Sequence, residues 1–140
     1  MTLLGHTTDE TDGIILDMLE ENGRESLANI AKRTGMSTAA VGRRVRKMLD
    51  SGVIRKFTVE RSEVGAIVLV SVDSEHDTAQ ISEMLSESLG IRTVYEITGQ
   101  YDIACIIRAA AIPEINDRID DLRRTPGVAD TNTVIILRRI

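Results

Sequence analysis

The sequence predicts an α+β protein, with an N-terminal helix-turn-helix of three helices followed by a C-terminal ferredoxin-like βαββαβ domain. Three observations lead to this prediction. Capped apolar stripes at helical spacing occupy residues 9–52, β-branched runs alternate with helical stripes over residues 66–137, and a basic segment from Arg24 to Lys56 stands out in an otherwise acidic chain. We expect residues 1–58 to form the helical domain, 59–65 a short linker and 66–140 the sheet domain.

Three helices are predicted between Asp9 and Gly52. Asp9, Ser26 and Ser37 each precede an apolar stripe and suit the first position of a helix, where their side chains can accept backbone N–H groups. Gly35 suits the tight turn after the short second helix, because this turn needs a positive φ. The expected inward-facing residues are Ile15, Leu16 and Leu19, then Leu27, Ile30 and Ala31, then Val41, Val45 and Met48.

The net charge of −5 conceals a basic segment. Nine Lys or Arg residues and only two acids lie between Arg24 and Lys56, which gives this segment a charge of +7. The rest of the chain holds 8 cations and 20 acids, a charge of −12. A basic module on an acidic body indicates an anionic partner, and its position on a helix-turn-helix favours double-stranded DNA.

The third helix is expected to enter the major groove of DNA with its N-terminal half. Small side chains there allow close approach to base edges, and Arg43 is long enough to reach a guanine or a phosphate. Gly42 either permits this approach or makes room for packing, whereas Arg44 either contacts DNA or binds a carboxylate of the fold. The predicted DNA-contacting residues are Ser37, Thr38, Ala39, Ala40, Gly42, Arg43, Arg46 and Lys47.

The second half predicts strand, helix, two strands, helix and strand. Gly99-Gln100 fits a two-residue type II′ turn between the two central strands. An extended segment from Val53 through Val59 is expected to join the two domains as a strand. Both faces of the strands are apolar, so the face without helices is expected to pair sheet-to-sheet in a dimer. The predicted strands are 66–72, 92–98, 101–108 and 128–137. The first predicted helix is 76–89, and the second begins at Pro113 and ends before residues 125–127.

Several classes of function find no support in the sequence. Cys105 lies in an apolar run, which favours a buried structural thiol. His6 and His76 lie far apart in polar stretches, so we expect no metal site. The second half shows no nucleophile with a base and no phosphate loop, and we expect neither an enzyme nor a cofactor. No apolar stretch reaches the ~18 residues of a membrane span, which favours the cytoplasm.

Four stretches resemble the Lrp/AsnC, or feast/famine, family of transcriptional regulators. DETDGIILDMLEENGRESLANIAKRTG and MSTAAVGRRVRKMLDSGVI resemble its helix-turn-helix, and VYEITGQYDIACII and GVADTNTVIIL resemble its ligand-binding module. The resemblance covers residues 9–138. It implies a homodimer that assembles into a tetramer, an octamer or a larger ring and responds to a small-molecule effector, typically an amino acid. The stretch 59–65 is shorter than the usual family linker, which puts an inherited spacing of DNA half-sites in doubt.

The resemblance also implies an effector cleft at the family's Gly-x-Tyr-Asp turn, here Gly99, Tyr101 and Asp102. Thr98 precedes this turn, and Thr131 and Thr133 lie on the last strand. Asp102 would pair with an amino group, and Thr98 and Gly99 would donate to a carboxylate. The alternative is that the turn only closes the hairpin.

Two other functions remain as alternatives: an effector-independent DNA-organising protein and an enzyme like the tetrapyrrole decarboxylases that share this build. Such an enzyme needs acid–base groups around its substrate. Both histidines of this chain lie outside the predicted cleft.

Overall fold

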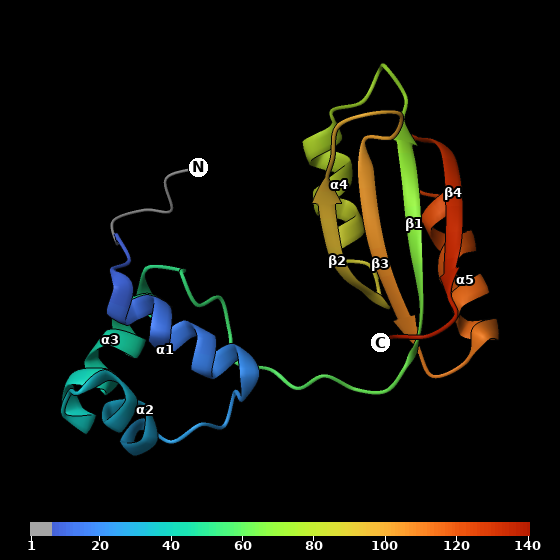
Figure 1. The fold of residues 1–140 in the computed structure, drawn as a ribbon. Helices are drawn as coiled ribbons and strands as arrows, with labels where there is room; N and C mark the ends of the chain where they lie inside the picture. Colours follow the sequence, from blue (N-terminus) through green and yellow to red (C-terminus); the bar gives the residue numbers. More distant parts are fainter. Residues whose placement is uncertain (1–6) are drawn as a thin grey trace. The chain divides into compact units, whose positions relative to one another are not determined.

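The computed structural model describes residues 7–140, and the chain divides after Glu60 into two compact units (Figure 1). We call residues 7–60 the helical unit and residues 61–140 the sheet unit. His6 and the rest of positions 1–6, which the sequence assigns to the helical domain, lie outside the described residues.

The helical unit consists of α1 (Glu10–Glu21), α2 (Leu27–Thr34) and α3 (Thr38–Asp50). Asp9 accepts the N–H of Asp12 and donates its own N–H to the Asp12 side chain, which forms a capping box. Ser26 and Ser37 cap the other two helices as predicted. Gly35 has φ 71° after α2, so the left-handed turn expected there is confirmed.

The core of the helical unit lies where the three helices meet. Its buried residues are Ile15 of α1, Ile30 and Ala31 of α2, and Val41 and Met48 of α3. Leu27 was predicted to face this core, but its side chain is 38% exposed. Leu27 is the first residue of α2. Its side chain lies against α3 at Gly42 and does not enter the core.

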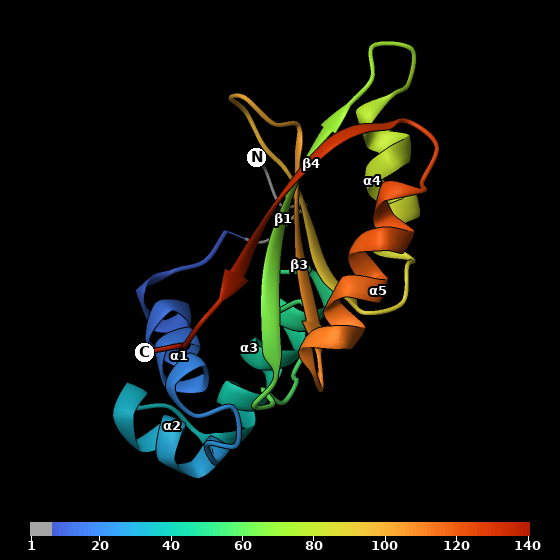
Figure 2. The same ribbon diagram turned by 90° about the vertical axis from the view of Figure 1, so that its right-hand side faces the viewer.

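The sheet unit consists of β1 (Val64–Val72), α4 (Thr78–Ser86), β2 (Ile91–Glu96), β3 (Ile103–Ala109), α5 (Ile112–Arg123) and β4 (Val128–Ile136). The strands form one antiparallel sheet in the order β2-β3-β1-β4. Figure 2 shows α4 and α5 on the same face of this sheet. This arrangement confirms the predicted α+β class and the βαββαβ order.

The helix-covered face of the sheet holds the second core. Val68 and Cys105 face each other across β1 and β3, and both are fully buried. Ile81 and Leu85 of α4 and Ile115 of α5 pack over this face. Burial raises the pKa of the Cys105 thiol to about 11, as expected for a structural cysteine.

The other face of the sheet has no helix over it within the sheet unit. Ile106, Ile67 and Val134 lie side by side across β3, β1 and β4, and Val134 is 49% exposed. Leu69 and Ala104 form the next pair on the same face. This apolar row is the surface that the sequence predicted for pairing.

Two predictions about strands are wrong. The segment from Val53 through Val59 forms no strand among the described residues, because no neighbouring strand offers it a ladder of hydrogen bonds. The β2–β3 connection is not a two-residue turn: the ladder ends at Glu96 and Ile103, and the last hydrogen bond between the two arms runs from the Ile97 N–H to the Asp102 oxygen at 2.9 Å. Glu96 pairs with Ile103, so Gly99-Gln100 still lies at the middle of the connection. Asp102, however, hydrogen-bonds to β1: its N–H donates to the Val70 oxygen at 2.9 Å.

Candidate nucleic-acid interface and ligand loop

The outer side of α3 holds the residues that the sequence predicted to contact DNA. Val41 and Met48 turn toward the core and fix which side of the helix faces outward. Ser37 occupies the N-cap, where its hydroxyl accepts the N–H of Ala40 at 3.1 Å. Ala40 and Gly42 are half-buried, and the exposed members of the predicted set are Ser37, Thr38, Ala39, Arg43, Arg46 and Lys47.

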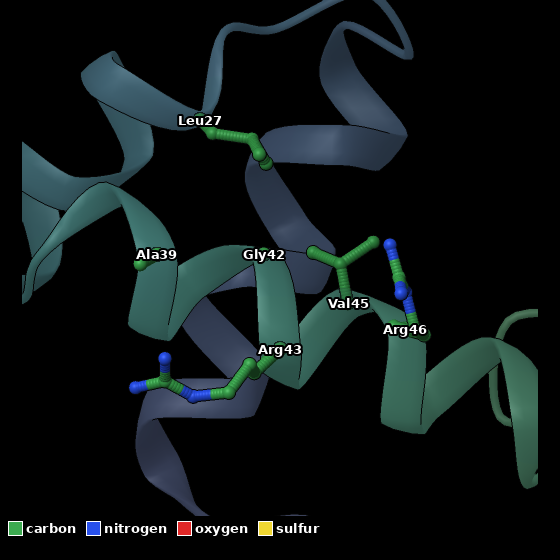
Figure 3. Close-up of a pocket in the computed structure, with 6 residues that line it drawn as sticks. All are labelled: Leu27, Ala39, Gly42, Arg43, Val45 and Arg46. Atoms are coloured by element: carbon green, nitrogen blue, oxygen red, sulfur yellow. The ribbon is translucent and has the colours of Figure 1, made fainter.

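Arg43, Arg46 and Lys47 make no ion pair with any acid in the described part of the chain. Figure 3 shows the guanidinium groups of Arg43 and Arg46 pointing in different directions from α3, on either side of Gly42. Their charges are therefore available to an external anion.

Arg44 behaves differently from its neighbours. Its Nη1 donates to Asp9 Oδ2 and to Asp12 Oδ1, both at 2.8 Å, and the Asp12 side chain is only 1% exposed. The hydrogen bond from Arg44 is the main reason that the pKa of Asp9 lies below its usual value, and the bond to Asp12 raises the pKa of Arg44. Arg44 thus ties α3 to the start of α1, which confirms the carboxylate interpretation.

A hollow of about 370 Å³ lies on the surface between α2 and α3 (Figure 3). Leu27, Ala39, Gly42 and Val45 line it with apolar groups, and Arg43 and Arg46 complete the lining. A Cβ added at Gly42 would lie 3.4 Å from Leu27 Cδ1, an ordinary van der Waals distance, so packing does not require glycine there. Leu27 and Val45 were not predicted to lie on this surface, since both fit the inward-facing stripes of their helices.

The β2–β3 connection contains Thr98, Gly99, Tyr101 and Asp102. Asp102 Oδ2 accepts the Val72 N–H at 2.8 Å, at the point where a register shift interrupts the β1–β4 pairing. One carboxylate oxygen of Asp102 therefore has a structural role, because it accepts the backbone N–H of Val72 at the end of β1. Gly99 has φ 117°, a conformation that favours glycine.

Thr131 and Thr133 lie elsewhere. They stand opposite Val70 and Val68, so their side chains share the helix-covered face of the sheet. Arg123 Nε of α5 donates to Thr131 Oγ1 at 3.0 Å, and Thr133 Oγ1 is buried with no hydrogen-bond partner within residues 7–140. Strand β1 separates both threonines from the connection, so a single chain does not bring the six predicted effector residues together.

The described residues contain no group of three or more His, Cys, Asp or Glu side chains arranged to hold a metal ion. None of the described helices has the length and apolar character needed to cross a membrane.

Comparison with known proteins identifies both halves of the chain. Residues 9–49 match the model of the AsnC-type helix-turn-helix domain, and residues 65–140 match that of the Lrp/AsnC ligand binding domain. The chain is 41% identical over 133 residues to the HTH-type transcriptional regulator LysM of Sulfurisphaera tokodaii, covering 93% of this chain and 95% of LysM.

Solved structures agree. The structure of Escherichia coli AsnC superposes with a TM-score of 0.75 at 25% identity and covers 96% of this chain and 95% of AsnC. A transcriptional regulator of Neisseria meningitidis in complex with L-Met shares the fold, with a TM-score of 0.80 at 23% identity over 96% of this chain and 92% of its own. The comparisons do not favour the DNA-organising or decarboxylase alternatives. The chain belongs to the Lrp/AsnC family of helix-turn-helix transcriptional regulators.

Proposed function

We propose that α3 is the DNA-recognition helix of this regulator and that Arg43, Arg46 and Lys47 supply its main contacts. One observation carries this proposal: these three exposed cations have no acidic partner among the described residues, whereas Arg44, between them, is held by Asp9 and Asp12. Thr38, Ala39, Ala40 and Gly42 would bring the helix backbone close to base edges, and Ser37 would support the first turn. The regulator would act in the cytoplasm on double-stranded DNA, without an enzymatic step.

Arginine truncation tests this proposal. Arg43→Ala and Arg46→Ala should each weaken binding to a selected DNA site about tenfold to a hundredfold, because a charge-assisted contact to a guanine or a phosphate contributes ~1–3 kcal/mol. Arg124→Ala is the matched control, since Arg124 is an exposed arginine of the sheet unit near Asp121. Footprinting and light scattering would measure DNA binding and particle mass, and the mass should stay constant. Unchanged footprints for both α3 variants would contradict the assignment of α3.

We further propose that the sheet unit binds an amino-acid effector at the β2–β3 connection, through Thr98, Gly99, Tyr101 and Asp102. The family model describes this unit as a ligand binding domain, and a neighbour with the same fold was solved with L-Met. One Asp102 oxygen already accepts the Val72 N–H, so an effector amino group would share this carboxylate with the fold. Thr131 and Thr133 face the helices, and a contribution from them would require a rearrangement of that layer.

A thermal-shift screen against the twenty amino acids tests the effector proposal. A ligand at 100 times its Kd stabilises the fold by about 2.7 kcal/mol. Asp102→Asn is the informative variant, because its carboxamide oxygen can still accept the Val72 N–H while its negative charge is gone. This variant should lose the ligand shift and keep the ligand-free melting temperature. No shift with any amino acid would favour an effector-independent regulator.

We also propose that the chain forms a homodimer through the uncovered sheet face and that dimers assemble into tetramers or larger rings. Ile67, Ile106 and Val134 form an apolar row there, and burying it would add hydrophobic stabilisation. Ile67→Asp should lower the particle mass in light scattering, whereas Ile112→Asp, at an exposed position at the start of α5, should not. A constant mass for Ile67→Asp would contradict this interface.

A further inference from the structure

The hollow between α2 and α3 combines two properties that seldom occur together on an anion-facing surface. Leu27, Ala39, Gly42 and Val45 give it an apolar floor, and Leu27 there is 38% exposed. Arg43 and Arg46 flank the same hollow, and no acid lines it. The arginines suit a polyanion, but phosphates offer nothing to the apolar floor.

The major groove of DNA presents one prominent apolar group, the 5-methyl group of thymine. The edges of guanine, adenine and cytosine present hydrogen-bond donors or acceptors, which the side chains of Leu27, Ala39 and Val45 cannot satisfy. An apolar floor therefore favours thymine because only thymine brings a methyl group to it, whereas guanine and adenine would place polar atoms there without a partner and cytosine lacks the methyl group.

We propose that this hollow is a specificity site that receives the 5-methyl group of one thymine in each half-site of the target DNA. The inference rests on the proposed role of α3 and adds Leu27 and Val45 to its reading surface. Gly42 lies at the centre, where the absent side chain lets the base edge reach the floor. Arg43 and Arg46 then lie within reach of the flanking guanines or phosphates.

The test begins with the full-length protein and random double-stranded DNA, from which preferred sequences are selected. Each thymine of the selected half-site is then replaced singly by deoxyuridine, which lacks the methyl group but keeps the same hydrogen-bonding groups. One position should weaken binding about fourfold, the equivalent of ~0.8 kcal/mol for one buried methyl group. 5-Bromodeoxyuridine, whose bromine is similar in size to a methyl group, should restore binding at that position.

Leu27→Ala should remove most of this discrimination and bring the deoxyuridine effect below about twofold. Leu89→Ala is the matched control, since Leu89 is an exposed leucine of the sheet unit, and it should leave the fourfold effect intact. If no thymine is sensitive, or if the sensitivity survives in Leu27→Ala, the hollow is not the methyl site, while α3 keeps its role. A wrong assignment of α3 would show itself in a different result: Arg43→Ala and Arg46→Ala would then bind DNA as well as the wild type.

Discussion

The two units of this protein differ in how many of their exposed arginines are paired with acids. In the sheet unit, Arg61 and Arg92 both contact Glu63 at 3.5 Å, and Arg123 lies 3.9 Å from Asp120. These cations are balanced by acids of the same unit. With 13 acids and 8 arginines in residues 61–140, the sheet unit as a whole is acidic.

In the helical unit, only part of the basic surface is balanced. Asp9 and Asp12 hold Arg44, while the other cations of α3 find no acidic partner in the described part of the chain. Composition alone does not distinguish these cases, because adjacent arginines in one sequence stretch have different neighbours in space. A cation is available to an external anion only where no acid of the fold already pairs with it.

Salt should produce the largest difference between the two units. If the cations of both α3 helices of the proposed dimer make about six phosphate contacts, DNA affinity should fall roughly 10³-fold between 50 and 200 mM salt. Lys47→Gln should reduce the slope of log K against log salt by about 1 for each chain, because one counterion fewer is released. Arg124→Gln should leave the slope unchanged, and a shallow slope for the wild type would contradict the availability of these charges.

Removing an acid should have unequal effects in the two units. Asp12→Ala should destabilise the helical unit by about 1–3 kcal/mol, because it removes a buried acceptor from both Arg44 and the α1 cap. Asp120→Ala breaks only an exposed pair with Arg123 and should cost less than about 0.5 kcal/mol. Urea unfolding followed by the NMR signals of each unit measures both values. Equal losses would show that Asp12 is no more important than a surface acid.

Gly42→Ala should separate stability from DNA binding. Alanine is favoured over glycine inside a helix by about 0.5–1 kcal/mol, and the added Cβ meets Leu27 at an ordinary contact distance. The variant should therefore melt at a higher temperature but bind DNA more weakly, since its methyl group partly fills the hollow. Gly13→Ala in α1 is the control: a Cβ there has no neighbour within 4 Å, so it should gain stability without losing DNA affinity.

The smallest effect concerns single carboxyl groups. Arg44→Gln should raise the pKa of Asp9 toward its usual value of 3.8, measured by NMR titration of the carboxyl carbon. Asp73 in the sheet unit is the comparison, because its contact with the ring of His76 lowers its pKa, and Arg44→Gln should not change it. A depressed carboxyl pKa stabilises the fold above pH ~4, and this stabilisation is lost as pH falls through the folded-state pKa. If the pKa of Asp9 is the same in Arg44→Gln as in the wild type, Arg44 does not lower it.

Much of the fold was predictable because its signals are short-range. The caps at Asp9, Ser26 and Ser37 act over three residues, and the positive φ of Gly35 follows from its place after a short helix. The alternation that marks β3 likewise follows from the side-chain period of a strand. These features identified the helix-turn-helix, the βαββαβ order and the outward side of α3.

The prediction was wrong where a residue has a distant partner or lacks one. Leu27 fits an inward stripe, but its position at the start of α2 directs it toward Gly42. The segment from Val53 through Val59 has the residues of a strand, but the described part of the chain offers it no neighbour. A periodic pattern shows which face a residue occupies and does not show which element will lie beside it.

The two units, their order, the basic segment from Arg24 to Lys56 and the helix that presents cations all follow from the amino-acid sequence. Which side chains remain available for function depends on how the segments pack in the folded chain. Arg44 meets Asp9 and Asp12 across 35 and 32 residues, and Asp102 meets Val72 across 30. The physical reason is that caps and periodicities depend on neighbours within one helical turn, whereas the partner of a charged group depends on how distant segments pack together.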